Sequence, residues 1–124
     1  MGDWVSKHYS SRSFVEDLLS KNAGTEVFLC GWAFRYRDQG GVIFIDLRDR
    51  TGIIQIVARK EIIPDGFKEA EHVRSEFVLA VKGKLQKRSE DAVNPNLATG
   101  HLEIIIEKFS VLNHSKTPPF QLDE

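Results

Sequence analysis

Five residues carry the side chains best suited to binding a ligand: Arg35, Arg37, Phe44, Gln55 and Glu103. An exposed aromatic ring can stack on an unpaired nucleic-acid base, for roughly 1–3 kcal/mol per base. An amide offers both a donor and an acceptor to a base edge, whereas a carboxylate only accepts. Arginine holds phosphates or base edges through its planar fork. Together these residue types predict a surface that binds single-stranded RNA.

A strand pattern places these side chains on one face of a sheet. Over residues 42–48, isoleucines and a leucine alternate with Phe44 and its neighbours, so the ring points away from the apolar set. Over residues 53–58 Gln55 points the same way, and later in the chain Glu103 alternates with apolar residues. We expect the preceding strand to add its two arginines to this outward face.

The elements that position these residues are five strands, expected over residues 26–38, 42–48, 53–58, 76–88 and 101–112. Gly31 predicts a bulge or sharp bend inside the long first strand. A capping box from Ser13 to Glu16 predicts an N-terminal helix over about residues 13–22. Another short helix is predicted between the third and fourth strands. This order predicts an all-β fold with short helices, a five-stranded Greek-key barrel of the oligonucleotide-binding (OB) type.

The chain of 124 residues fits one domain. We expect that domain to cover residues 1–112. Pro118-Pro119 excludes a strand interior, so residues 113–124 are predicted to be an extended linker.

Charge and composition exclude several classes of protein. Apolar residues make up 41% and charged residues 28%, as in ordinary globular proteins. The net charge of −1 means that a polyanion must be held by a local patch, and residues 35–60 have such a basic excess. Cys30 has no second cysteine and is read as a small buried apolar residue. Without a membrane-length apolar run or a signal peptide, we expect a cytoplasmic protein that does not contact a membrane.

Other interpretations of the same residues remain open. Phe44 could be covered by a helix or loop, or lie in a dimer interface. The alternating charges of residues 48–50 are typical of a turn braced by surface ion pairs. Asp46, Asp49 and Glu103 could bind a divalent metal for hydrolysis, but no His or Cys ligand spacing, phosphate loop or nucleophile motif supports that reading. We therefore predict neither a catalytic residue nor a metal site in this chain.

The run GWAFRYRDQGGVIFIDLRDRTGIIQIV, followed by NPNLATGHLEI and KTPPF, closely resembles the N-terminal anticodon-binding domain of bacterial-type aspartyl-tRNA synthetases, which are class II enzymes. The resemblance implies a barrel that grips the anticodon loop of aspartate tRNA, with bases G, U and C. It implies that Phe44 stacks on the middle uracil and that Gln55 hydrogen-bonds to it. It also implies that Glu103 helps to read the anticodon, and that Arg35 and Arg37 contact bases or backbone.

Further candidate RNA contacts are Tyr36, Gln39, Arg48 and Asn94. The sequence departs from the family at three positions. Tyr36 replaces the middle one of three basic residues, and could stack instead. Ala92 occupies a loop position where relatives can have a polar contact. Gln39 stands where leucine or histidine is common, which leaves discrimination between aspartate and asparagine tRNAs open.

The resemblance also implies what lies outside these residues. Enzymes of this class are homodimers that use ATP and magnesium in a separate catalytic domain, whose motifs are missing from this sequence. We therefore expect the fragment to bind tRNA without any cofactor and without aminoacylating it, while the whole protein would be an aspartate-tRNA ligase. Asparaginyl-type, lysyl-type or non-discriminating anticodon binding, a sequence-tolerant single-strand binder and a protein-interaction module are the alternatives.

Overall fold

Strand β1 (Glu26–Asp38) is long enough to serve two sides of a barrel in the computed structural model, which describes residues 3–113. Its first half pairs with β4 and its second half pairs with β2. The strand can bend there because Gly31 has no side chain: a Cβ at this position would lie 2.5 Å from the carbonyl oxygen of Arg48. The register shift falls slightly later, between Ala33 and Arg35, so Phe34 is the bulged residue. The predicted bend is therefore confirmed, with the bulge beyond Gly31.

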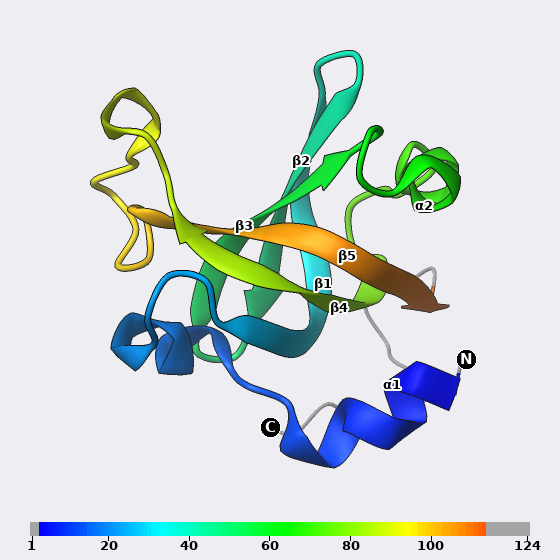
Figure 1. The fold of residues 1–124 in the computed structure, drawn as a ribbon, viewed down its shortest axis with the longest axis horizontal. Coiled ribbons are helices and arrows are strands. Elements are labelled where there is room, and N and C mark those ends of the chain that lie inside the picture. Colours follow the sequence, from blue (N-terminus) through cyan, green and yellow to red (C-terminus); the bar gives the residue numbers. More distant parts are fainter. Residues whose placement is uncertain (1–2, 114–124) are drawn as a thin grey trace.

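The other strands complete a closed barrel (Figure 1). They are β2 (Val42–Asp49), β3 (Gly52–Arg59), β4 (Val78–Lys87) and β5 (Leu102–Asn113). The strand order around the barrel is β1-β2-β3-β5-β4. Only the β3–β5 pairing is parallel among the strand pairs of the described residues. This arrangement confirms the predicted five-stranded OB-type barrel.

The barrel interior is filled by the apolar residues whose alternation predicted the strands. Ile43, Ile45 and Leu47 from β2 and Ile54 and Ile56 from β3 are all at most 1% exposed. Residues 39–41 form the predicted tight turn between β1 and β2, with Gly40 at a positive φ of 67°. Because these isoleucines and the leucine of β2 and β3 pack inward, the residues that alternate with them face outward, and only those outward residues can meet a ligand.

Short helices close the barrel. Helix α2 (Pro64–Ala70) lies between β3 and β4 as predicted, and buries Phe67 and Ala70 in the barrel core. Before β1 in the sequence, the 3₁₀ helix η2 (Val15–Ser20) contributes Val15 and Leu18 to the same core. A second 3₁₀ helix, η3 (Glu90–Ala92), lies in the β4–β5 connection.

The predicted helix over residues 13–22 is wrong in its start and its capping. Ser13 donates its backbone N–H to the carbonyl of Phe28 over 2.8 Å, and Phe14 rather than Ser13 occupies the N-cap position of the helix. The backbone N–H of Phe14 is instead accepted by Oδ2 of Asp17 over 2.8 Å. The helix therefore begins after Phe14, and Asp17 rather than Glu16 makes the capping contact.

The outer side of β1 and β4 is covered by an N-terminal segment that the sequence did not predict to be helical. Helix α1 (Asp3–His8) and η1 (Tyr9–Ser11) precede η2. Val5 packs with Phe28, Cys30 and Ala80 on the outer side of β1 and β4. Cys30 is 4% exposed, which confirms it as a small buried apolar residue, and burial raises the pKa of its thiol to about 12.

Two further expectations concern the ends of the fold. Strand β5 continues to Asn113, one residue past the predicted boundary at 112. The rest of the predicted linker, residues 114–124, lies outside the described residues. Within the described part of the chain, no helix combines the length and apolar character needed to cross a membrane.

Candidate nucleic-acid interface

A row of polar residues crosses the outer face of all five strands. Paired in register, its members are Arg35 on β1, Asp46 on β2, Gln55 on β3, Glu103 on β5 and Gln86 on β4. These residues come from distant parts of the sequence and are brought side by side because β3 and β5 pair in parallel. The row contains three of the residues predicted to bind RNA.

Hydrogen bonds connect the centre of this row. Gln55 donates from Nε2 to Oε1 of Glu103 over 2.9 Å, and Gln86 donates from Nε2 to Oε2 of the same carboxylate over 2.7 Å. Gln55 and Glu103 are only 5% and 9% exposed. The alternation correctly placed both side chains on the outer face, but the expectation that they are exposed there is wrong, because neighbouring side chains of the row cover them.

This network changes the role that the geometry favours for Glu103. Each of its carboxylate oxygens already accepts a hydrogen bond from an amide. Glu103 therefore holds Gln55 and Gln86 in fixed orientations. Gln55 retains one amide hydrogen and part of the acceptor capacity of Oε1 for a ligand. A donor and an acceptor side by side on one amide match a base edge that offers an acceptor beside a donor, as uracil does.

Phe44 lies beside this network, together with Arg37. The two residues are Cα partners in the β1–β2 ladder. The guanidinium carbon of Arg37 is 4.8 Å from the centroid of the Phe44 ring, within range of a cation–π contact. Arg37 also donates from Nη2 to Oε1 of Gln55 over 3.5 Å, a long hydrogen bond. One exposed guanidinium thus links a half-buried ring to the central amide, and a base stacked on Phe44 would meet all three groups.

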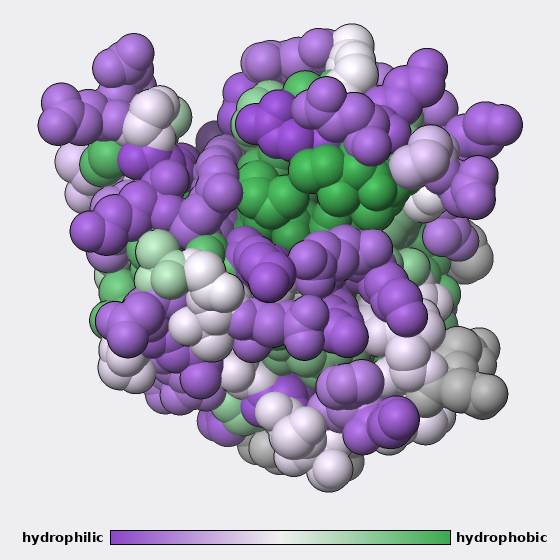
Figure 2. Space-filling model, viewed as in Figure 1, coloured by the Kyte–Doolittle hydropathy of each residue, from purple (hydrophilic) through white to green (hydrophobic). Residues whose placement is uncertain are grey.

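Figure 2 has the same view as Figure 1, in which β4 and β5 lie in front, and it shows an apolar patch within a hydrophilic surround. The outer row that follows the polar one is partly apolar, since Phe44 pairs with Val57 and Val57 pairs with Ile105. Val57 is fully covered, whereas Phe44 and Ile105 are partly exposed. A flat apolar strip beside hydrogen-bonding groups suits a base, which has an apolar face and a polar edge.

The additional residues that the resemblance implied are placed differently from one another. Arg48 is exposed on the outer face of β2, in line with Phe44. Gln39 is exposed in the β1–β2 turn, where its backbone N–H donates to the carbonyl of Val42 over 2.9 Å. Asn94 lies in the β4–β5 connection, where its Oδ1 accepts from the backbone N–H of Asn96 over 3.0 Å.

Tyr36 does not share this face. It pairs with the inward-pointing Ile45, its ring packs against the barrel core, and its hydroxyl donates to the carbonyl of Glu71 over 3.2 Å. Alternation along β1 gives Tyr36 the parity opposite to that of Arg35 and Arg37. The idea that Tyr36 stacks on a base in place of a basic residue is therefore wrong for this face.

Sequence reasoning missed two residues of the network, Gln86 and Arg88. Burial lowers the pKa of Arg88, whereas the negative charges of Glu103 and Asp46 act in the opposite direction and raise it. Its Nε donates to the carbonyl of Leu102 over 2.9 Å and its Nη1 to that of Ala92 over 3.2 Å. In the part of the chain that the structure describes, its Nη2 is buried without a hydrogen-bond partner. In the sequence, Arg88 stands out only as the last residue of a basic cluster formed with Lys82, Lys84 and Lys87.

Within residues 3–113 the aspartates of the Arg35–Gln55 stretch form no ion pair with an arginine, so the surface ion pairs expected for residues 48–50 are not found there. Asp38 accepts the backbone N–H of Gly40 over 3.1 Å. Oδ2 of Asp49 accepts the backbone N–H of Val15 over 2.8 Å, and its Oδ1 accepts both the N–H and the hydroxyl of Thr51. Asp49 thus braces the β2–β3 turn, as predicted, through the backbone and a hydroxyl. Short local hydrogen bonds to backbone N–H groups are favoured over exposed ion pairs because they order fewer flexible atoms.

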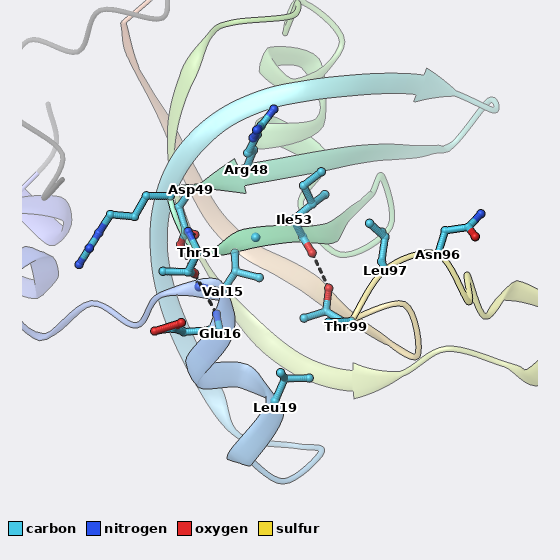
Figure 3. Close-up of a pocket in the computed structure, with 13 residues that line it drawn as sticks. Val15, Glu16, Leu19, Arg48, Asp49, Thr51, Ile53, Asn96, Leu97 and Thr99 are labelled. Carbon is cyan, nitrogen blue, oxygen red and sulfur yellow. Dashed lines mark hydrogen bonds between the residues drawn. The ribbon is translucent and has the colours of Figure 1, made fainter.

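A cavity of about 410 Å³ adjoins this turn (Figure 3). It lies between η2, the β2–β3 turn and residues 96–99 of the β4–β5 connection. At its wall the backbone N–H of Glu16 donates to the hydroxyl oxygen of Thr51 over 3.0 Å, and the hydroxyl of Thr99 donates to the carbonyl of Ile53. Among residues 3–113, no group of three or more His, Cys, Asp and Glu side chains could hold a metal ion. The metal-site reading of Asp46, Asp49 and Glu103 therefore finds no support in the described geometry.

Comparison with known proteins agrees with this surface. Residues 27–112 match the tRNA anti-codon family, described as OB-fold nucleic acid binding domain. An aspartate–tRNA(Asp/Asn) ligase of Brachyspira hyodysenteriae is 47% identical over 114 residues, which cover 91% of this chain and 20% of that protein. The ligase of the same name from Moorella thermoacetica is 50% identical over 108 residues, or 87% of this chain and 18% of that protein. The chain thus spans about a fifth of the length of these curated relatives.

Among solved structures, asparaginyl-tRNA synthetase from Pyrococcus horikoshii complexed with asparaginyl-adenylate superimposes with a TM-score of 0.70 and 27% identity. That alignment covers 86% of this chain and 24% of the synthetase chain. The match over residues 27–112 begins in β1 and ends in β5, so it includes every residue of the outer polar row. The resemblance seen in the sequence is confirmed, and the chain belongs to the tRNA anti-codon family of OB-fold nucleic acid binding domains.

Proposed function

We propose that this chain recognises the anticodon loop of a tRNA through the outer face of β1, β2, β3 and β5. The observation that carries the proposal is the contact of one guanidinium, that of Arg37, with both the ring of Phe44 and the amide of Gln55. Stacking and edge recognition need a ring and an amide that a single base can reach together. The family and the names of the relatives support tRNA as the RNA concerned.

The middle base of the anticodon is assigned to this cluster. A uracil stacked on Phe44 would present its N3–H and a carbonyl to the amide of Gln55, whose second amide hydrogen and Oε1 are complementary to them. Glu103 acts as a positioning residue, because it fixes the amide through the 2.9 Å hydrogen bond. Arg35, at the β1 end of the polar row, holds the RNA backbone or a neighbouring base.

The proposal extends to which tRNAs are accepted. Both ligases described above carry names that specify tRNA(Asp/Asn). Since aspartate and asparagine anticodons differ in the last base, C against U, we infer that this chain accepts GUC and GUU loops with similar affinity. Gln39, in the β1–β2 turn, and Asn94, in the β4–β5 connection, lie in loops rather than in the polar row, and discrimination would have to come from residues of this kind.

The whole protein is proposed to be an ATP-dependent aspartate-tRNA ligase that acts as a homodimer, with this chain as its anticodon-binding part, residues 1–112, followed by a linker. We assign neither ATP nor magnesium to the described residues, where the carboxylates of Asp38, Asp49 and Glu103 are engaged in hydrogen bonds to amides and to the backbone. Both would bind in a catalytic domain beyond this chain.

The test is a titration of the chain with fluorescently labelled stem-loop RNAs. Loops carrying GUC and GUU should bind alike, whereas replacing the middle U by A should weaken binding by about 1–3 kcal/mol, because hydrogen-bonding groups of the site lose their partners. A sequence-tolerant single-strand binder predicts equal affinity for all loops and for unrelated oligonucleotides, with a steep dependence on salt. That outcome would refute anticodon recognition, and absence of any RNA binding would point to a protein-interaction module.

A further inference from the structure

Phe34 is a large apolar side chain that the fold leaves 39% exposed. It is the bulged residue of β1, in the register shift between the pairs Ala33–Leu47 and Arg35–Asp46. At a bulge, two residues of one strand stand opposite a single residue of its partner. Before the bulge, Val27, Leu29 and Ala33 point into the barrel, so Phe34 points outward. The bulge then shifts the alternation by one residue, so that Arg35 reaches the same outer face as Phe34.

Two guanidinium groups flank the ring. The guanidinium carbon of Arg35 is 5.7 Å from the centroid of Phe34, and that of Arg48 is 5.4 Å from it. All three side chains are exposed. The arrangement repeats the pairing of Arg37 with Phe44, where the distance is 4.8 Å. The outer face thus has two aromatic rings, and each of them has at least one arginine guanidinium within cation–π distance.

The two rings are too far apart to serve one base. Phe44 is paired with Arg37, three residues beyond Phe34 along β1, which corresponds to about 10 Å of strand. The Arg35–Asp46 pair lies between the two rings. We propose that Phe34 is a second stacking platform, which takes a base of the same RNA neighbouring the one on Phe44, while Arg35 and Arg48 hold the adjoining phosphates.

The chemistry of the site favours RNA over another apolar surface. A lone ring between two cations offers little contiguous apolar area to a protein, but it offers stacking and charge neutralisation to a nucleotide. The other large exposed apolar side chains, Leu19, Ile62 and Val93, belong to other elements and do not enlarge this patch into an interface. The inference rests on the proposed function, since it extends the same surface for the same class of ligand.

The experiment compares Phe34→Leu, Phe34→Trp and Phe44→Ala in binding to a GUC stem-loop and to a set of stem-loops with one abasic loop nucleotide each. Ile62→Ala is the matched control, because Ile62 is an exposed apolar residue outside the face. Phe34→Leu should weaken binding to the intact loop about 5- to 150-fold, the loss expected for one stacked base. Phe34→Trp should preserve binding. Thermal unfolding of each variant confirms that the fold is intact.

The abasic set identifies the nucleotide concerned. The loss caused by Phe34→Leu should disappear for one abasic position, and that position should differ from the one at which the Phe44→Ala loss disappears. If Phe34→Leu behaves like Ile62→Ala, or weakens every abasic RNA equally, or shares its position with Phe44, the second platform is refuted. Those results leave the proposed function standing as long as Phe44→Ala weakens binding. If neither Phe34→Leu nor Phe44→Ala changes the affinity for the GUC stem-loop, the proposed function itself fails.

Discussion

Gln55 and Glu103 are 48 residues apart in sequence and are joined by a 2.9 Å hydrogen bond between their side chains on the outside of the barrel. They meet because β3 and β5 pair in parallel with these residues in register. The bond leaves the Gln55 amide fixed in orientation, while each carboxylate oxygen of Glu103 already accepts one hydrogen bond, from Gln55 or from Gln86. The contact therefore separates a residue that can read a base from one that positions it.

Glu103→Ala should weaken binding of a GUC stem-loop without Glu103 touching RNA. If Glu103 acts through Gln55, the effects of Gln55→Ala and Glu103→Ala will not add, and a double-mutant cycle should give a coupling energy of about 0.5–3 kcal/mol. Calorimetric titration of the four proteins measures it. Strict additivity would mean that Glu103 contributes independently, as a direct contact. Glu103→Gln is the conservative comparison, since it retains the size but not the charge.

Phe44→Ala should reduce affinity for the same stem-loop by about 1–3 kcal/mol, since it removes the ring on which the base stacks and the partner of Arg37. Phe44→Tyr, which preserves a π face, should bind nearly as well as the original chain. Fluorescence anisotropy provides the measurement. An unchanged affinity of Phe44→Ala would show that the ring only covers the sheet.

Asp49→Ala should destabilise the fold by about 2–4 kcal/mol. The carboxylate accepts hydrogen bonds from Val15 and Thr51, is 6% exposed, and ties η2 to the β2–β3 turn. Its removal leaves the buried N–H of Val15 unsatisfied. Urea unfolding followed by circular dichroism measures the change, and Asp38→Ala, which affects an exposed turn, is the control. Similar stability losses in both variants would contradict a bracing role specific to Asp49.

Gly31→Ala should be strongly destabilising, because the new Cβ would lie 2.5 Å from the carbonyl oxygen of Arg48, which belongs to the backbone and cannot move aside as a side chain could. A loss of about 2–4 kcal/mol is expected from overpacking and displacement of β2 from β1. Gly41→Ala is the matched control, since no atom lies within 4 Å of a Cβ there. A Gly31→Ala variant as stable as Gly41→Ala would show that the bend does not depend on this close approach.

The thiol of Cys30 should resist alkylation in the folded protein. Burial raises its pKa to about 12, so almost no thiolate is present near neutral pH. The unfolded chain, with a pKa near the ordinary value of 9.0, loses this proton first. The contribution of the Cys30 thiol to the free energy of unfolding is therefore fully present below about pH 9, and it declines as the pH rises from there toward 12. Labelling by iodoacetamide at pH 8, with and without urea, tests it; equal rates would contradict burial.

Much of this fold could be predicted from the sequence because it follows from local alternation. The pattern of Ile43, Ile45 and Leu47 fixed the inward face of β2, and with it the outward direction of Phe44. The family resemblance then supplied the expected ligand. The predicted helix start at Ser13 was wrong for a tertiary reason. Ser13 belongs to a capping pattern, but its backbone N–H donates to the carbonyl of Phe28, and Phe14 takes the N-cap position instead.

Alternation along a single strand predicts the face on which each residue lies, but it does not predict which residues of other strands lie beside it. The sequence by itself thus determined which side chains are polar, which are aromatic and which face each occupies. Only the tertiary structure decided that Gln55 and Glu103 are buried against each other, that Tyr36 is anchored to Glu71, and that a bulge brings Phe34 and Arg35 to the same outer face. The physical reason is that strand register and bulges depend on pairing between segments far apart in the chain, where local preferences carry no information.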